Sequence, residues 1–390
     1  MKCHIFIITH SPFTKRDYNR YGIEILQKFF KVEVLDCTPW LESKFWNEYS
    51  NISYKFSGYT PIFDWNGYKK QIAGKTRGVA IICLHGDISG FQRIGQPLRE
   101  QGILLAIERL AIVPEVRINN LFQKLYFSYK QRILFNQILK KINPAPKVNI
   151  DTKSTLSADI AILSGSDCMK DPHVMQATHS IWAHSFDYDV YLNHKYSPSE
   201  RNDPYAVFLD ENMIYNNDYE FIGINPPATE KKYYNELNNF FTILKTKTEY
   251  KVIVAAHPSS DYENRPHSFV GQEIIFGKTA ELVRDAQLVF CHASTSISYA
   301  VLWNKPMVFL TTNELDRSFL GPMIAFRSRL FHSPLINISD IDKLRIDLNV
   351  WMQINKFDYV DYKERYLKKT GTPDIPTWQI FSDYLRQNLK

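Results

Sequence analysis

The sequence contains no uninterrupted apolar run of the roughly 18–20 residues that a transmembrane helix requires, so it predicts no membrane span. The apolar segment at residues 3–9 is too short for a signal peptide and lacks a small-residue cleavage site, and we interpret it as a buried strand. The five cysteines are odd in number and form no C-x-x-C pair, which argues against a disulfide framework and a zinc site. These absences predict a protein of the reducing cytosol.

Several catalytic motifs are missing as well. The sequence has no G-x-G-x-x-G after the first strand, no Walker A motif, no H-E-x-x-H and no G-x-S-x-G. A D-x-D motif occurs as Asp187-Tyr188-Asp189 and would suit a metal-dependent sugar transferase. Such a site usually follows a strand in the nucleotide-binding half, whereas the stronger nucleotide signals here lie further along. We therefore predict no essential metal and no cofactor.

The length and composition indicate a folded protein with more than one domain. A chain of 390 residues exceeds what one hydrophobic core usually fills, so two domains of roughly 150–200 residues are expected. With 44% hydrophobic and 23% charged residues, the composition argues against a disordered or fibrous protein. The net charge of +6 permits attraction to anionic ligands or membrane surfaces but argues against a dedicated nucleic-acid binder.

Short β-rich segments alternate with longer helical ones, which predicts an α/β fold with mostly parallel sheets. The expected strands are residues 3–9, 31–36, 78–84, 103–106 and 160–163 in the first half, and 205–209, 250–255, 273–276, 288–291 and 307–310 in the second. The expected helices are residues 20–30, 119–142, 231–245, 279–285, 296–303 and 340–354.

A polar stretch at residues 194–204 contains two prolines and no apolar periodicity, and it is the best linker candidate. We expect two Rossmann-like domains at 1–197 and 204–370, followed by a helical tail at 371–390. Two similar α/β halves suggest a ligand cleft between them, at the carboxyl ends of the strands.

The most informative stretch begins with an apolar strand that runs into His257-Pro258. Proline cannot donate to a strand ladder and disfavours helix before it, so His257 is expected at the carboxyl tip of the strand. A histidine there can donate to a phosphate or ribose oxygen. A loop histidine satisfied by the backbone is the alternative.

Two further turns follow at regular intervals. Thr279 is placed to cap a helix that starts with Ala, Glu and Leu, and a plain capped helix is one interpretation of it. The second turn carries Ser294, Thr295 and Ser296 between a buried strand and the next helix. Hydroxyl groups and unpaired N–H groups at such a turn form an anion site. A simple N-cap is the alternative, but one hydroxyl would suffice for that.

The order strand-His-Pro, helix, strand-Ser-Thr-Ser-helix, Asn-Lys-Pro-strand resembles the donor-binding half of glycosyltransferases with the GT-B architecture, over residues 205–312. It is most similar to bacterial sialyltransferases and related nonulosonic-acid transferases of surface polysaccharide assembly. The resemblance implies two Rossmann-like domains facing a central cleft, with the acceptor side in the first and the donor side in the second. It also implies that His257 and Pro258 contact a CMP donor and that the hydroxyl-rich turn holds its phosphate, with Thr279 nearby.

The resembling families carry an acidic D/E-D/E-G motif ahead of His-Pro, which supplies the general base. The nearest match here is Asp210-Glu211-Asn212, with Asn where the family has Gly. The resemblance implies that Asp210, at the end of the first strand of the second half, is the base. A solvated turn is the alternative interpretation of Asp210 and Glu211.

Other polar residues precede the linker or follow strands of the first half. Alternation would place Asp187 and Asp189 on one face of an extended segment, where they would bind acceptor hydroxyls or act as base; exposed turn residues are the alternative. Loops after apolar strands carry the acceptor-side candidates His10, Ser11, His85 and Ser166.

The sequence therefore predicts an inverting glycosyltransferase that moves a nonulosonic acid of the sialic, pseudaminic or legionaminic type from a CMP-sugar to a bacterial surface glycan of a capsule or lipopolysaccharide. The expected partners are the nucleotide sugar and the glycan acceptor, with no nucleic acid, and with peripheral association to the inner membrane or an assembly complex left open.

Three alternatives remain open. The first is a GT-B transferase for a UDP- or GDP-sugar, with Glu281 or Glu314 on the ribose. The second is a non-catalytic envelope-assembly protein that docks through its aromatic, lysine-bearing C-terminal segment. The third is a nucleotide-sugar epimerase of similar two-domain form.

Overall fold

The computed structural model describes residues 3–83, 88–114, 156–199, 201, 203–216, 219, 224–340 and 344–389. The chain divides into two compact units. The first unit combines Met1–Ile112, Val148–Leu192 and Glu364–Lys390, and the second includes Asn193–Lys363. The sequence-based boundaries differ from this division at the C-terminus, where the segment beginning at Glu364 belongs to the first unit.

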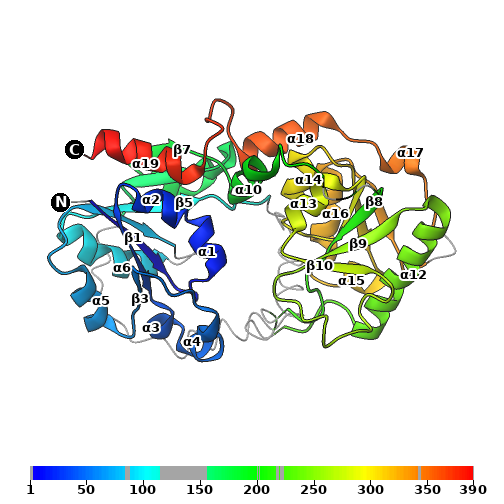
Figure 1. Cartoon of the computed structure of the whole chain (residues 1–390), viewed down its shortest axis with the longest axis horizontal. Helices are drawn as coiled ribbons and strands as arrows, with labels where there is room; N and C mark the ends of the chain where they lie inside the picture. Colours follow the sequence, from blue (N-terminus) through cyan, green and yellow to red (C-terminus); the bar gives the residue numbers. More distant parts are fainter. Residues whose placement is uncertain are drawn as a thin grey trace. The chain divides into compact units, whose positions relative to one another are not determined.

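The first unit is built on a parallel sheet of seven strands in the order β3-β2-β1-β4-β5-β6-β7 (Figure 1). The strands are β1 His4–Thr9, β2 Lys31–Asp36, β3 Tyr59–Pro61, β4 Gly78–Ile82, β5 Leu104–Arg109, β6 Ile160–Leu163 and β7 His179–Trp182. The central strands are almost wholly apolar and buried, because helices cover both faces of a parallel sheet.

The alternation of side chains along β1 assigns the helices of the first unit to the two faces of the sheet. Ile5 and Ile7 pack with apolar residues of α2 and α19, whereas Phe6 and Ile8 pack with those of α5 and α6. The helices of this unit are α1 Lys15–Arg20, α2 Ile23–Gln27, α3 Thr38–Leu41, α4 Ser43–Tyr49, α5 Trp65–Ile72, α6 Ile88–Glu100, α9 Pro172–Met175, α10 Phe186–His194, which runs past the unit boundary, and α19 Thr377–Asn388, with 3-10 turns at Ser50–Ile52 and Ser166–Lys170.

The second unit has a parallel sheet of six strands in the order β10-β9-β8-β11-β12-β13. They are β8 Tyr205–Leu209, β9 Lys251–Ala256, β10 Glu273–Phe276, β11 Leu288–Cys291, β12 Met307–Thr311 and β13 Leu335–Asn337. The helices are α12 Glu230–Thr248, α13 Thr279–Asp285, α14 Ile297–Leu302, α15 Asn313–Arg317, α16 Gly321–Leu330, α17 Leu348–Trp351 and α18 Lys356–Tyr362. A π-helical turn at Lys363–Leu367 follows α18 and runs past the unit boundary into the first unit.

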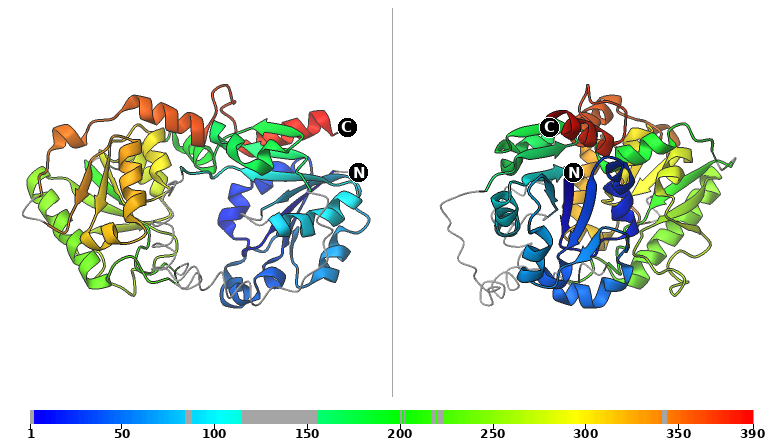
Figure 2. Two further views of the ribbon diagram at one scale, coloured as in Figure 1. Left: turned by 180° about the vertical axis from the view of Figure 1, so that it is seen from behind. Right: turned by 60° about the vertical axis from the view of Figure 1, so that its left-hand side comes forward.

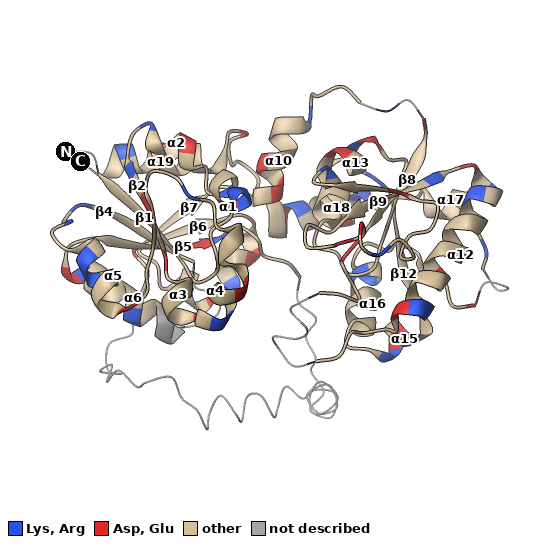
Figure 3. Ribbon diagram, turned by 60° about the horizontal axis from the view of Figure 1, so that its bottom comes forward, with Lys and Arg blue, Asp and Glu red and all other residues tan. Residues whose placement is uncertain are grey.

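Aromatic packing fills the core of the second unit. The ring of Phe240 on α12 meets Phe290 of β11 edge to face, with centroids 5.2 Å apart, and Trp351 of α17 lies 5.9 Å from Phe290. Within each unit the strands lie side by side with helices on both faces (Figure 2). Charged residues lie mainly on helices and loops, whereas the strands are mostly free of them (Figure 3). No helix in the described ranges is long and apolar enough to cross a membrane.

The structure confirms the expected fold class and every strand expected from the sequence. It adds the strands β3, β7 and β13, each at an edge of its sheet, where three or four residues leave too short a pattern to be recognised. The helix expected at 20–30 is interrupted at Gly22, and the one expected at 340–354 is confined to α17. The helix expected at 119–142 lies outside the described residues.

The helix α19 completes the apolar face of the first unit. Trp378 is 1% exposed, and its indole N–H donates to the carbonyl of Arg20 at 2.5 Å. Gly22 has φ 50°, and a Cβ atom there would lie 2.7 Å from Cδ1 of Trp378. The backbone at Gly22 is therefore held against the indole with no room for a side chain.

We expect Gly22→Ala to destabilise the first unit more than Gly74→Ala. Both glycines have a positive φ, so alanine at either site carries a backbone cost of about 1 kcal/mol. A Cβ atom at Gly74 would meet nothing within 4 Å beyond its chain neighbours, whereas one at Gly22 would clash with Trp378. Chemical denaturation followed by tryptophan fluorescence measures the difference. An equal decrease in the free energy of unfolding in both variants would show that Trp378 of α19 does not pack tightly against Gly22.

Candidate functional site

Polar loops gather at one edge of the second unit's sheet. The carboxyl ends of parallel strands share an edge, and β8 pairs with both β9 and β11. The segment 210–212 after β8 therefore lies between the loop that starts at His257 and the turn that starts at His292. Each of its three residues contacts one of these neighbours.

Asp210 anchors the loop after β9. Its Oδ2 accepts hydrogen bonds from the backbone N–H of His257 at 2.9 Å, the hydroxyl of Ser260 at 2.9 Å and the hydroxyl of Tyr262 at 2.8 Å. Its Oδ1 accepts from the N–H of Asn212 at 3.0 Å. The residue is 6% exposed. These donors offset the cost of burying a carboxylate and fix the path of the His-Pro loop.

Asn212 reaches the same loop from a left-handed backbone conformation. Its φ is 48°, a region that Gly and Asn enter more readily than other residues. Its Nδ2 donates to Oγ of Ser259 at 3.2 Å, to the carbonyl of Ser259 at 3.4 Å and to the carbonyl of Tyr215 at 3.3 Å. The backbone conformation thus suits either Asn or Gly at this position.

The contacts of His257 define its neutral tautomer. The backbone N–H of Ser259 donates to Nδ1 at 3.3 Å, and Oγ of Ser259 lies 2.8 Å from the same nitrogen. A backbone N–H can only donate, so Nδ1 is unprotonated and the ring proton is assigned to Nε2. The side chain is partly exposed and Pro258 is exposed. His257 follows directly on β9, at the carboxyl tip of the strand where the sequence predicts it, with its ring proton on Nε2.

Glu211 contacts the turn after β11. Its Oε1 accepts the backbone N–H of Ala293 at 2.7 Å. Burial raises the pKa of Glu211 to about 7, against the lowering effects of the Arg327 guanidinium and the Ala293 N–H. Asp210 adds a like charge, which raises the same pKa. Glu211 nevertheless keeps partial exposure to solvent.

His292 holds the start of the turn after β11 in place through hydrogen bonds in the core. This residue is fully buried, and its Nδ1 donates to the carbonyl of Leu310 at 2.7 Å while Nε2 accepts from the hydroxyl of Tyr233 at 3.0 Å. Burial lowers the pKa of His292 to about 4, so the ring is neutral near pH 7. This role has no signal in the sequence, because both partners are distant along the chain.

The hydroxyl-bearing residues of the turn, Ser294, Thr295 and Ser296, follow His292 along the chain. Ser294 is buried, and its Oγ accepts the N–H of Ser296 at 3.2 Å. Thr295 is exposed and Ser296 is partly exposed. The turn leads into α14, as expected from the sequence.

Arg327 of α16 is a second residue that the sequence did not reveal. It is 3% exposed, and its Nη1 donates to the carbonyl of Ala293. Its Nε has no hydrogen-bond partner among the described residues. Glu211 and Arg327 therefore hold the N–H and the carbonyl of the same residue. An arginine in a helix is ordinarily exposed, so its sequence context does not indicate this burial.

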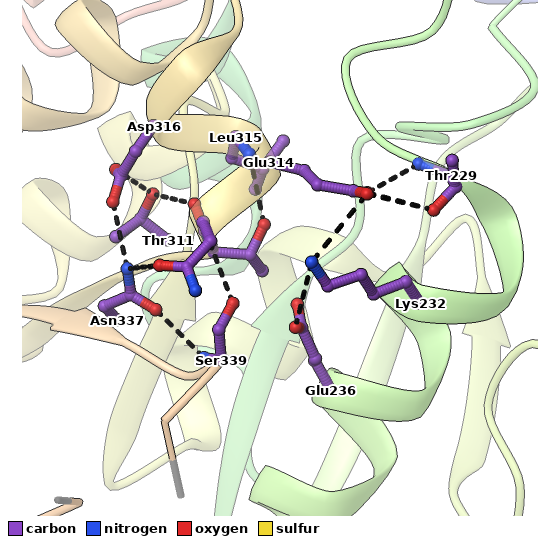
Figure 4. Close-up of polar contacts among 11 residues, drawn as sticks. Thr229, Lys232, Glu236, Thr311, Glu314, Leu315, Asp316, Asn337 and Ser339 are labelled. Atoms are coloured by element: carbon purple, nitrogen blue, oxygen red, sulfur yellow. Dashed lines mark hydrogen bonds and ion pairs between the residues drawn. The ribbon is translucent and has the colours of Figure 1, made fainter.

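The structure also places Thr279, Glu314 and Glu281, three further residues singled out in the sequence. Thr279 is the first residue of α13, and the N-cap is Lys278, so the expected capping role of Thr279 is wrong. It still follows β10 and lies at the same sheet edge as His257. Glu314 is engaged within the fold: it accepts from the N–H of Thr229 at 2.8 Å and lies 3.8 Å from Nζ of Lys232 (Figure 4). Glu281 lies 3.9 Å from Nδ1 of His194.

The acceptor-side candidates lie at strand ends of the first unit. His10 and Ser11 follow β1, and Nδ1 of His10 is 3.0 Å from the carbonyl of Cys83, after β4. Ser166 begins the 3-10 turn after β6 and is partly exposed. His85 lies outside the described residues. The parallel order of β1, β4, β5 and β6 places these loops at one edge.

Asp187 and Asp189 are not on an extended segment; that expectation is wrong. Both belong to the first turn of α10, where residues two apart point roughly 200° apart around the axis. Asp189 accepts the N–H of Thr377 at 3.0 Å, at the start of α19, and lies 3.8 Å from Nδ1 of His184. Burial raises its pKa. The alternating polar and aromatic residues of this segment imitate a strand.

The second unit's edge thus offers donors suited to an anion and one carboxylate, Glu211, suited to exchange a proton near neutral pH. In the described ranges, no group of three His, Cys, Asp or Glu side chains is arranged to hold a metal ion.

We expect the stability difference between Glu211→Gln and the wild type to depend on pH. The ordinary pKa of 4.5 is raised to about 7 in the fold, so between these values the native state holds a proton that the unfolded state has lost. Wild-type stability from this group is therefore present at pH 5 and lost by pH 8, by up to about 3 kcal/mol. The variant lacks this loss.

Denaturant unfolding at pH 5 and pH 8 measures the effect, with the exposed Glu263→Gln as the control. The free energy of unfolding of Glu211→Gln, relative to the wild type, should be higher at pH 8 than at pH 5. A pH-independent difference would contradict the raised pKa.

Comparison with known proteins gives matches in fold. No protein-family model matches the chain, and no curated protein is significantly similar in sequence. The wall teichoic acid polymerase TagF, as its H444N variant, aligns over 100% of this chain and 89% of its own, with a TM-score of 0.51 and 11% identity.

A second similar structure is a putative UDP-N-acetylglucosamine 2-epimerase from Listeria monocytogenes. It aligns over 100% of this chain and 97% of its own, with a TM-score of 0.50 and 12% identity. At these identities the likeness concerns the fold alone, and the two names describe different reactions. With its two parallel-sheet α/β units, the chain has the GT-B architecture.

Proposed function

We propose that the chain is a GT-B glycosyltransferase that transfers a sugar from a nucleotide-activated donor to a glycan acceptor. The observation that carries this proposal is the segment 210–212, whose three residues tie the His257 loop to the Ser294 turn at the carboxyl edge of one sheet. Ligands of open α/β sheets bind at this edge. A donor imidazole and a hydroxyl-rich turn held by one short segment suit a phosphate group.

The donor phosphate would be bound by groups from two loops. The Nε2–H of His257 donates to one phosphate oxygen, and the hydroxyl groups of Ser294, Thr295 and Ser296 donate to others. Thr279 borders the same edge. In the transfer, these donors stabilise the negative charge that builds on the departing nucleotide. Because the nucleotide is already a good leaving group, positioning and charge stabilisation supply much of the rate.

The donor we propose is a CMP-activated nonulosonic acid of the sialic, pseudaminic or legionaminic type, transferred with inversion to a bacterial surface glycan. Support comes from the His-Pro and acidic motifs together, and from the left-handed backbone at Asn212 that accounts for Asn in place of Gly. The acceptor would approach the strand ends of the first unit that carry His10, Ser11 and Ser166. We expect this to occur in the cytoplasm, without a metal or cofactor.

A UDP-sugar is the second candidate donor. It is favoured by the fold likeness to a putative UDP-N-acetylglucosamine 2-epimerase. Against it, Glu314, one of the two carboxylates expected on the ribose, is instead engaged by Thr229 and Lys232, and the other, Glu281, lies 3.9 Å from Nδ1 of His194.

We expect CMP to raise the melting temperature of the wild-type protein more than UDP or GDP does. At a ligand concentration of 100 Kd, binding stabilises the native state by about 2.7 kcal/mol. His257→Ala should remove most of this shift, and His267→Ala, at an exposed histidine of the same unit, should retain it. A larger shift with UDP would replace the proposed donor. No shift with any nucleotide would favour a non-catalytic protein.

Transfer itself is tested by incubating the protein with CMP-sialic, CMP-pseudaminic and CMP-legionaminic acids and a surface glycan. Release of CMP that depends on the acceptor is the expected result. Absence of both transfer and CMP release, with UDP- and GDP-sugars also inactive, would overturn the transferase proposal.

A further inference from the structure

We propose that Glu211 is the carboxylate that accepts the proton of the attacking hydroxyl group, and that Asp210, the base implied by the motif, is a positioning residue. This inference rests on the proposed transferase function and goes beyond it by assigning the proton acceptor. The two residues are adjacent in sequence but differ in their contacts, their exposure and the charges around them.

Asp210 is occupied by the fold. Its Oδ2 already accepts three hydrogen bonds, from His257, Ser260 and Tyr262, and its Oδ1 accepts a fourth from Asn212. A carboxylate oxygen offers about two lone-pair sites, so Oδ2 has none left for an incoming proton. Protonation at Oδ2 would also break the contacts that hold the His-Pro loop. The hydrogen bonds of Asp210 therefore indicate that it positions the loop after β9.

Glu211 is engaged more lightly. Its Oε1 accepts the backbone N–H of Ala293, and the backbone N–H of His292 also acts on the carboxylate, but within the described ranges no side chain donates a hydrogen bond to either of its oxygens. Unlike Asp210, it keeps partial exposure to solvent. The contact with Ala293 places the carboxylate beside the turn that we propose for the donor phosphate. A substrate at that turn would lie next to Glu211.

The charges around Glu211 suit a base that works near neutral pH. The groups facing it are Asp210, Tyr233 of α12, Cys291 and His292 at the end of β11, and Arg327 of α16. Burial raises the pKa values of the tyrosine and the cysteine and lowers that of the histidine, so all three are neutral.

Among the residues that the structure describes, Asp210 and Arg327 are then the charges that act on Glu211, and they act in opposite directions. Arg327 is held in place by its bond to the carbonyl of Ala293. It has an electrostatic role, because it limits how far burial raises the pKa of Glu211 to about 7. A general base is most effective when its pKa lies near the working pH.

The step balances as an acid–base displacement. The acceptor oxygen forms a bond to the anomeric carbon while its proton moves to a Glu211 carboxylate oxygen. The bond from the anomeric carbon to the phosphate oxygen breaks, and its electron pair leaves with the nucleotide. The resulting carboxyl group then loses its proton to water, which restores the base.

The first experiment compares Glu211→Gln with Asp210→Asn in transfer assays and in CMP-induced thermal shifts. Glutamine keeps an acceptor for the Ala293 N–H, so Glu211→Gln should lose about 10²–10⁴-fold in kcat while the CMP shift is retained. Asp210→Asn should weaken the loop, and therefore raise KM and reduce the CMP shift, with a smaller loss of kcat. An active wild type with kcat unchanged in Glu211→Gln would overturn the assignment and leave the proposed function intact.

The second experiment records kcat against pH for wild type, Arg327→Lys and Arg327→Met. Because the base must be deprotonated, wild-type kcat should fall below about pH 7. Arg327→Met removes the cation that lowers the pKa of Glu211, so the fall should move to higher pH, whereas Arg327→Lys should keep it near the wild-type position. Arg329→Met, at an exposed position on the same helix, is the control and should match the wild type.

An unmoved profile in a folded Arg327→Met protein would contradict the assignment of Glu211. Should Arg327→Met fail to fold, Glu211→Asp replaces it, because a shorter base should keep an acid limb that Glu211→Gln has lost. If the wild type itself transfers no sugar from any donor tested, the proposed function fails, and this assignment fails with it.

Discussion

A buried carboxylate needs hydrogen-bond donors from the protein to replace water. In the second unit, this requirement at Asp210 fixes the loops around the candidate site. The donors are the N–H of Asn212, just after β8, and groups of the loop after β9. The hydrogen bonds to this one carboxylate therefore also fix the position of His257. Glu211 and Asn212 extend the same segment to the Ser294 turn and to Ser259. The geometry of the whole edge therefore depends on three residues, and on neutral groups such as His292 that hold the turn in place.

The first unit also holds a buried carboxylate at the end of a strand, although on a different strand of its sheet. Asp36 ends β2 and is fully buried, and its oxygens accept from the N–H of Phe13 at 3.3 Å, the N–H of Thr38 at 3.0 Å and the hydroxyl of Tyr59 at 2.8 Å. In each unit a strand-end carboxylate thus fastens loops that are distant in sequence. Buried charges of this kind contribute little net stability, but they fix one arrangement of the loops against others. A site assembled from loops needs such fixing more than it needs additional apolar packing.

The sequence is sufficient for the fold and for the location of the candidate site, and insufficient for the roles within it. Strands such as β9 and β11 are found because continuous apolar runs bounded by His-Pro or by hydroxyl residues have few other interpretations. The contrast between Asp210 and Glu211 is invisible in the sequence, because the donors that occupy Asp210 lie up to 52 residues away. Arg327 is equally hidden, since nothing near it in the sequence distinguishes a buried guanidinium from an exposed one. The helix at Asp187 and Asp189 is missed because its alternating pattern has the period of a strand and its contacts are made with α19.

The discontinuity of the first unit has a consequence for the order in which the chain can acquire structure during synthesis. The apolar face of its sheet that includes Ile5 and Ile7 is covered by Trp378, Phe381 and Leu385 of α19. The second unit draws its sheet from the single stretch Asn193–Lys363, so it can close while the polypeptide is still growing. The first unit begins to be translated first, but its sheet is covered only when α19 is made. Until α19 has left the ribosome, the apolar face that contains Ile5 and Ile7 is exposed to chaperones.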